Sequence, residues 1–171
     1  MANYNFNKDI ADGERGEQVV REDLELAGAS YIGDNKNNQY DIIMTMPNGK
    51  DVKFEIKTDV WCIPGKIIEM PFGNITIPSR DNGNMFIEFE CRGKDSGIRV
   101  SKAEWFVTYF PHYGEMWYIM MDKLITLCES ENIPTSEQAG DEDSNTKGYL
   151  LPRNEYKEHF KIRKTEYKWE S

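Results

Sequence analysis

Three charged side chains lie on two neighbouring segments of this sequence. Asp41 opens the run 41–45, and Glu55 and Lys57 lie in the run 52–58. Two carboxylates and a lysine on adjacent strands can form a divalent-metal site, where the metal activates water and stabilises the charge that develops during phosphodiester hydrolysis. Mg²⁺ prefers oxygen ligands and keeps several waters, so one or two carboxylates are enough to hold it. The pattern predicts a metal-dependent nuclease in which Asp41 and Glu55 hold the metal.

The two runs are joined through Asn48-Gly49, which favours a β-hairpin. Their apolar side chains share one buried face if the strands pair in a single register: Ile42 with Ile56, and Met44 with Phe54. This register predicts Asp41 opposite Lys57, and Ile43 opposite Glu55, so that the charged residues lie together on the other face. It requires a loop of odd length or a bulge, because a two-residue turn would separate Asp41 from Glu55 and Lys57.

Lys57 follows Glu55 by two residues, so both side chains point to the same face of a strand. A lysine there can orient or help to deprotonate the attacking water, or pair with the scissile phosphate. Glu17, and less readily Glu14, lies at the start of a helix predicted over 13–27 and can complete the site. Glutamate is also favoured in a first helical turn by the helix dipole, and Glu-x-Lys alone is common on exposed sheet faces. The prediction therefore rests on the combination of these residues.

A glutamate in a first helix, an aspartate that opens a strand, and Glu-x-Lys on its hairpin partner resemble the PD-(D/E)XK nuclease superfamily, which includes restriction endonucleases and Holliday junction resolvases. The likeness covers residues 13–58, with Tyr40 where the superfamily often has proline. It implies a restriction endonuclease-like α/β core, a mixed sheet flanked by helices. It also implies Mg²⁺ or Mn²⁺ bound by Asp41, Glu55 and the backbone carbonyl of Ile56, with Glu17 in support.

The 171 residues predict a single domain, 1–171, with α/β layers around a mixed sheet. Other elements are predicted as follows: strands over 84–91, 105–110 and 116–121, a helical turn over 101–104, a helix capped by Asp122, a short helix over 153–160, and a strand or tail over 161–169. The segment 61–78, rich in proline and glycine, is predicted to be irregular. The acidic segment 131–147 is predicted to be a flexible loop.

The net charge of −9 is unusual for a nucleic-acid enzyme, because phosphate binding normally needs a basic surface. A metal site must itself be acidic, however, and the segment 152–171 is basic, so the charge does not exclude a nucleic-acid partner. Weak candidates for phosphate contacts are Lys102, Lys161, Arg163 and Lys164. By family analogy DNA is expected rather than RNA, and the chain could act as a homodimer.

No apolar run approaches the length of about 18 residues that spans a membrane, and no secretory signal is present. We therefore expect a cytoplasmic protein, located in the host cell if the gene is carried by a phage or mobile element. The favoured activity is that of a DNA endonuclease, structure-selective or nonspecific. The alternative is a catalytically silent module of nuclease fold that binds nucleic acid or a protein partner; the presence of all three residues Asp41, Glu55 and Lys57 argues against it.

Overall fold

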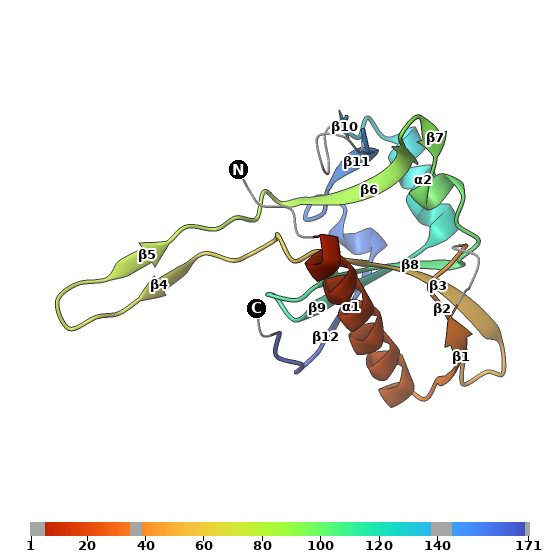
Figure 1. Ribbon diagram of the computed structural model, residues 1–171, viewed down its shortest axis with the longest axis horizontal. Coiled ribbons are helices and arrows are strands. Elements are labelled where there is room, and N and C mark those ends of the chain that lie inside the picture. The colour runs from red at the N-terminus through yellow and green to blue at the C-terminus, as the bar shows by residue number, and fades with distance from the viewer. Residues whose placement is uncertain (1–5, 35–38, 138–144, 170–171) are drawn as a thin grey trace.

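The structure, a computed structural model, describes residues 6–34, 39–137 and 145–169. Its centre is a six-stranded sheet in the order β1-β2-β3-β8-β9-β12, in which β3 and β8 are parallel and all other neighbours antiparallel (Figure 1). The strands are β1 (Ser30–Asp34), β2 (Ile42–Thr45), β3 (Asp51–Thr58), β8 (Trp105–Phe110), β9 (Glu115–Met120) and β12 (Lys161–Lys164). The predicted α/β fold with a mixed sheet is confirmed.

Two layers cover this sheet. Helix α1 (Phe6–Leu26) packs on one face through Val19, Val20 and Leu24, which share a core cluster with Phe54 of β3. The other face contacts helix α2 (Met121–Ser130) and a second sheet in the order β10-β11-β6-β7. Its strands are β6 (Asn84–Cys91), β7 (Lys94–Asp95), β10 (Thr135–Ser136) and β11 (Lys147–Pro152). The aromatic side chains of β8 and β9 are largely buried between the layers, as expected for core.

The hairpin of β2 and β3 is paired two residues away from the predicted register, so that prediction is wrong. Ile42 lies opposite Phe54 and Met44 opposite Val52, and Ile56 has no partner in β2. Hydrophobic patterning fixes only which face a side chain occupies, and a shift of two residues leaves every face unchanged.

The turn sets the register that the apolar pattern leaves open. The N–H of Met46 donates to the carbonyl of Lys50 at 2.8 Å, so the strands close around residues 47–49. Gly49 has a φ of +81°, a conformation that favours glycine. The loop has odd length, as predicted, and the regular register ends with Ile42 opposite Phe54. The N–H of Asp41 donates to the carbonyl of that same Phe54 at 2.9 Å, so Asp41 is not paired with Lys57.

The segment 61–78, predicted to be irregular, contains a β-hairpin instead. Its strands β4 (Lys66–Ile68) and β5 (Ile75–Ile77) pair antiparallel and project far from the body of the molecule (Figure 1). Residues 63–80 are called the arm below. Proline and glycine flank each strand in the sequence and are typical of loops. Strands of only three residues between them therefore give no recognisable strand pattern.

Several other elements differ from the sequence predictions. Residues 101–104 are not helical, and a 3₁₀ helix, η1 (Gly97–Arg99), precedes them. Helix α2 is capped by Met120, not Asp122. The helix predicted over 153–160 is reduced to the 3₁₀ helix η2 (Lys157–His159), and the sequence patterns did not indicate β1, β10 or β11.

Only part of the predicted acidic loop can be compared with the structure, because residues 138–144 lie outside the described ranges. The described part contributes β10 and the first residue of β11. Within the described ranges, no helix is both long enough and apolar enough to cross a membrane.

Candidate active site

Asp41 lies immediately before β2, where the pairing of β2 with β3 ends. Its N–H donates to the carbonyl of Phe54 at 2.9 Å, and its carboxylate Oδ2 accepts the N–H of Ile56 at 2.6 Å. The N–H and C=O of one strand residue point to the same edge of the strand, so the carbonyl oxygen of Ile56 also faces the edge at which Asp41 lies. The aspartate and the backbone carbonyl that the sequence analysis proposed as metal ligands therefore lie at one place.

Glu55 lies on β3 beside this edge and is held by a neighbouring loop. The hydroxyl of Ser101 donates to Glu55 Oε2 at 2.9 Å, and the loop itself is fixed by the Lys102 N–H, which donates to the carbonyl of Gln39 at 2.7 Å. Burial and the charge of Asp41 raise the pKa of Glu55 to about 7, although the Ser101 hydrogen bond and the charge of Lys57 oppose the shift. Glu55 is therefore a poorly solvated carboxyl close to another one.

Glu17 approaches the same region from α1. Burial raises its pKa to about 7, with further contributions first from Asp41 and then from Asp34, Glu14 and Glu55. Burial also raises the pKa of Asp41, against the effect of the Ile56 hydrogen bond. These mutual effects show that the structure brings Glu17, Asp41 and Glu55 within electrostatic range of one another, as the sequence predicted.

Gly16 allows α1 to come close enough to β3 for Glu17 to reach this region. A Cβ atom at position 16 would lie only 1.7 Å from Thr58 Oγ1 and 2.8 Å from Thr58 Cβ, so no side chain fits there. Gly13, one turn earlier on the same helix, has open space around it. The two glycines thus offer a matched pair for testing the contact.

We expect Gly16→Ala to lower the free energy of unfolding by about 1–3 kcal/mol, because the helix must move away from β3. Gly13→Ala should instead raise it by up to about 1 kcal/mol, because alanine has the higher helix propensity. Urea denaturation of both variants measures the difference. Equal effects of the two substitutions would show that the helix does not depend on this close contact.

An open cleft of about 550 Å³ lies between α1 and the ends of β1 and β2. Six carboxylates line it: Glu14, Glu17, Glu22, Glu25, Asp34 and Asp41. Arg21 also lines it but is paired with Glu25 at 3.3 Å. A cleft of this composition repels a polyanion unless cations are bound in it.

Lys57 is exposed on β3, and its charge slightly lowers the pKa of Glu55. It neither lines the acidic cleft nor forms an ion pair among the described residues. Within those residues, no three His, Cys, Asp or Glu side chains converge closely enough to make a ready-formed metal centre. The three carboxylates are near one another, with one oxygen of Asp41 and one of Glu55 already hydrogen-bonded to the protein.

The four basic residues suggested for phosphate contacts do not gather at this site. Arg163 on β12 donates to both carboxylate oxygens of the buried Asp23, at 2.6 and 3.2 Å, so its guanidinium has an intramolecular partner. Lys161 and Lys164 are exposed on β12, at the edge of the sheet opposite to β1. Lys102 is exposed and follows Ser101, the residue that donates a hydrogen bond to Glu55.

Three further residues, not predicted from the sequence, influence the site. Asp34, at the end of β1, and Glu88, on β6, raise the pKa values of nearby carboxyls, and Ser101 holds Glu55. Residues 30–34, Ser-Tyr-Ile-Gly-Asp, do not alternate between apolar and polar side chains, so no local pattern marks β1 or Asp34. Glu88 alternates with apolar residues along β6, a pattern typical of a solvated face, but it is half-buried and accepts a hydrogen bond from Ser96 at 2.6 Å. No local signal marks Ser101, because its contact is tertiary.

The raised pKa values predict how pH affects the metal-free protein. Glu17 and Glu55 have an ordinary pKa of 4.5 and a folded pKa of about 7, so the folded state retains protons that the unfolded state releases. Their contribution to stability is present below about pH 4.5 and is lost as the pH rises to about 7. In EDTA, we expect Glu17→Gln/Glu55→Gln to lack this loss and to exceed the wild type in stability at pH 8. Parallel curves of unfolding free energy against pH for the two proteins would refute the assignment.

No protein-family model and no curated protein sequence matches this chain. Among solved structures, the fold is similar to a bacterial homing endonuclease, I-Ssp6803I, with a TM-score of 0.47 and 14% sequence identity over 82% of this chain and 76% of that one. A likeness this distant carries no argument about activity, and the resemblance to the PD-(D/E)XK superfamily stays a prediction from the residues.

Proposed function

We propose that this protein is a metal-dependent nuclease that hydrolyses phosphodiester bonds, with DNA as its substrate. The observation that carries the proposal is the meeting of Asp41, Glu55 and the Ile56 carbonyl edge at the point where β2 leaves β3, with Glu17 nearby on α1. Buried carboxyls that raise one another's pKa are costly for a fold, and such groups gather preferentially at functional sites.

The donor set fits Mg²⁺ or Mn²⁺, because all of its atoms are carboxylate or carbonyl oxygens. Asp41, Glu55 and the backbone carbonyl of Ile56 would hold the metal, and Glu17 would support it. A bound divalent cation offsets the repulsion among these carboxylates, activates a water molecule and stabilises the negative charge that develops on the phosphate. Asp41 Oδ2 and Glu55 Oε2 accept hydrogen bonds from Ile56 and Ser101, and the second oxygen of each carboxylate is available to bind the metal.

Other residues of the chain position the reacting groups. The Ile56 N–H and the Ser101 hydroxyl orient the two carboxylates. Lys57 extends from β3 on the face of Glu55 and is free to pair with the scissile phosphate or to orient the attacking water. Burial and Asp41 raise the pKa of Glu17 in the metal-free protein; a bound cation would lower it, so that Glu17 would be a carboxylate able to accept a proton.

The acidic cleft favours a second candidate, a catalytically silent module that binds a protein partner. Six carboxylates line the cleft, none of the four proposed phosphate-contacting residues lines it, and Arg163 is already paired with Asp23. A silent module has no need of a metal at Asp41 and Glu55. Titration with Mn²⁺ by calorimetry separates the two candidates, since only the nuclease should bind the ion in a manner that Asp41→Asn abolishes.

Cleavage of a fluorescent DNA panel tests the proposal directly. Single strand, duplex, flap and four-way junction are incubated with Mg²⁺, Mn²⁺ or EDTA. We expect cleavage with either metal and none with EDTA, and the preferred substrate will distinguish a structure-selective from a nonspecific enzyme. A folded protein that cleaves none of these substrates, nor the matching RNA panel, would leave the silent module as the better description.

A further inference from the structure

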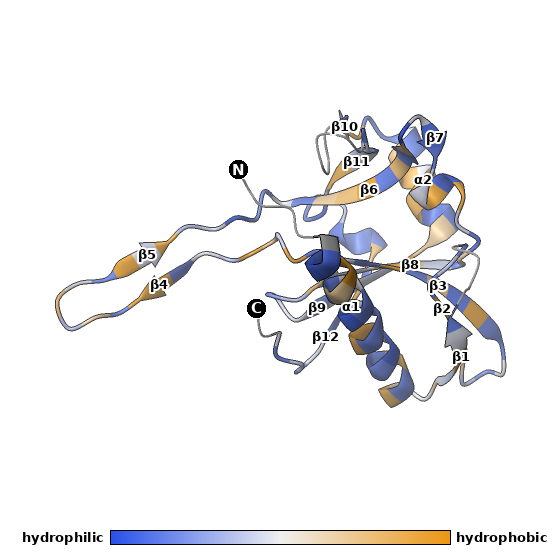
Figure 2. Ribbon diagram, viewed as in Figure 1, coloured by the Kyte–Doolittle hydropathy of each residue, from blue (hydrophilic) through white to orange (hydrophobic). Residues whose placement is uncertain are grey.

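The arm exposes an apolar surface that no described residue of its own chain covers. Phe72 is 103% exposed, Ile67 66%, Ile75 53% and Met70 50%, and part of each strand of the arm is coloured as hydrophobic in Figure 2. A two-stranded hairpin is only marginally stable by itself in water, and exposed apolar surfaces of this kind mark interaction sites. The arm is therefore a candidate interaction surface.

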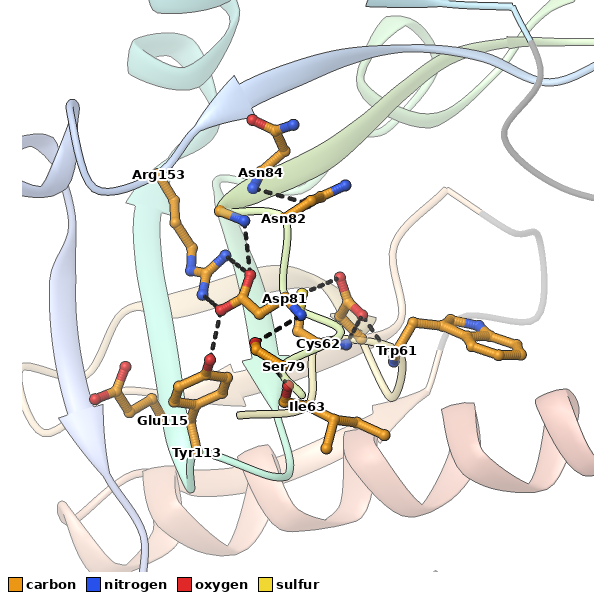
Figure 3. Close-up of polar contacts among 12 residues, drawn as sticks. Trp61, Cys62, Ile63, Ser79, Asp81, Asn82, Asn84, Tyr113, Glu115 and Arg153 are labelled. Carbon is orange, nitrogen blue, oxygen red and sulfur yellow. Dashed lines mark hydrogen bonds and ion pairs between the residues drawn. The ribbon is translucent and has the colours of Figure 1, made fainter. Parts of the chain in front are cut away.

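The root of the arm is built into the body by buried polar contacts (Figure 3). Asp81 accepts hydrogen bonds from Arg153, from the Tyr113 hydroxyl at 2.5 Å and from the Gly83 N–H at 2.8 Å. The two segments that enter and leave the arm are joined by a hydrogen bond: the Arg80 N–H donates to the carbonyl of Ile63 at 2.9 Å. The fold thus fixes the place from which the arm leaves the body.

The body carries a second uncovered apolar surface, a groove of about 560 Å³ beside the end of α1. Its apolar floor includes Val52, Phe54 and Trp105 of the sheet, and Ala27 lies on its helix side. A single helix, about 10 Å wide, cannot cover the face of a six-stranded sheet, whose strands are spaced about 4.8 Å apart. The groove is the part of this face that α1 leaves open.

We infer that the arm of one copy of this chain docks in the groove of a second copy, and that two copies exchange arms. The groove lies at the beginning of β3, whereas the arm follows the end of β3 at Thr58 and points away from the body (Figure 1). An arm therefore cannot fill the groove of its own chain. Reciprocal exchange covers both apolar surfaces at once and closes with two-fold symmetry.

The charges fit a second copy better than they fit DNA. The arm has two cationic residues, Lys66 and Arg80, but its outer part, residues 67–79, has a single charged residue, Glu69, and so offers no positive charge to a phosphate backbone. The groove is lined by the cationic Lys50 and Lys161, which can pair with Glu69. This association needs no cleavage activity and can be tested separately from it.

Sedimentation velocity tests the inference. We expect the wild type to have twice the 19.9 kDa mass of the chain at tens of micromolar, and Phe72→Asp to weaken dimerisation about 30-fold or more, as for a central apolar anchor. Ala27→Glu, in the groove, should have the same effect. Asn74→Asp adds the same charge next to the tip and should leave the dimer intact. Because Phe72 and Ala27 are exposed, thermal melting of the monomeric variants should show a folded protein.

Cross-linking identifies the contact. With Cys91→Ser in every chain, a mixture of Phe72→Cys and Ala27→Cys chains treated with a short bismaleimide should yield cross-linked dimers, and neither chain alone should. A monomeric wild type, an undiminished dimer in Phe72→Asp, or cross-linking of Phe72→Cys alone would each overturn the inference. A monomeric wild type whose affinity for duplex DNA falls in Phe72→Asp would assign the arm to DNA, and would also overturn it.

Discussion

Replacing Glu55 with glutamine is expected to lower the metal-dependent cleavage rate by about 100-fold or more, while the protein stays folded. Glutamine has the same shape and can still accept the Ser101 hydrogen bond, but it lacks the charge that binds a divalent cation. The substitution also removes a carboxyl whose pKa is raised by burial and by Asp41, so stability at pH 7 should not fall. Single-turnover cleavage with saturating Mg²⁺ measures the rate.

Two further variants make this test specific. Lys57→Met should lower the rate by a similar factor but leave Mn²⁺ binding unchanged, because Lys57 contributes no ligand. Asp51→Asn removes a carboxylate from the same strand at its opposite end, where Asp51 is exposed and accepts a hydrogen bond from Thr45 at 2.7 Å. This control should cleave at the rate of the wild type. Full activity in Glu55→Gln would remove the nuclease proposal at this site.

Replacing Asp81 with asparagine is expected to lower the free energy of unfolding by about 3–5 kcal/mol, because it leaves a buried guanidinium without its counter-ion. The side chains of Asp81 and Arg153 are only 10% and 6% exposed. The Arg153 hydrogen bonds, assisted by Tyr113, hold the pKa of Asp81 well below its usual range. Its ionic contribution is therefore present above the ordinary pKa of an aspartate and is lost as the pH falls to the lower folded value.

Urea denaturation at pH 7 measures this loss, with Asp95→Asn as the control. Asp95 pairs with Arg99 at 3.1 Å, but both side chains are exposed, so removing its charge should change stability by no more than about 1 kcal/mol. An effect of Asp81→Asn as small as that of Asp95→Asn would mean that water replaces the lost partner. Asp81→Asn should also loosen the root of the arm and weaken dimerisation, because Asp81 fixes that root.

The sequence was sufficient to predict that Glu55 and Lys57 lie on the face of β3 opposite to Phe54, because alternation along a strand determines the face. Alternation does not place Asp41, which lies before β2. The sequence could not determine which residues are opposite one another, since registers that differ by two bury the same side chains; the turn at 47–49 decides between them. The two strands of the arm were not predicted, because each is three residues long and is surrounded by proline and glycine. Ser101 and Glu88 reach Glu55 only through the tertiary fold, and spacing in the chain does not record such contacts.

Side chains of β12 and of the residues after it contact α1, which lies near the other end of the sequence. Arg163 and Asp23 are 140 residues apart in sequence, and the Arg15 guanidinium donates to the Tyr167 hydroxyl across 152 residues. Closing a loop over such distances lowers the entropy of the chain before any contact stabilises it, so chains of this topology fold slowly. On the ribosome, Asp23 stays without its counter-ion until β12 has emerged, and during that interval the uncovered apolar arm is a hazard for aggregation.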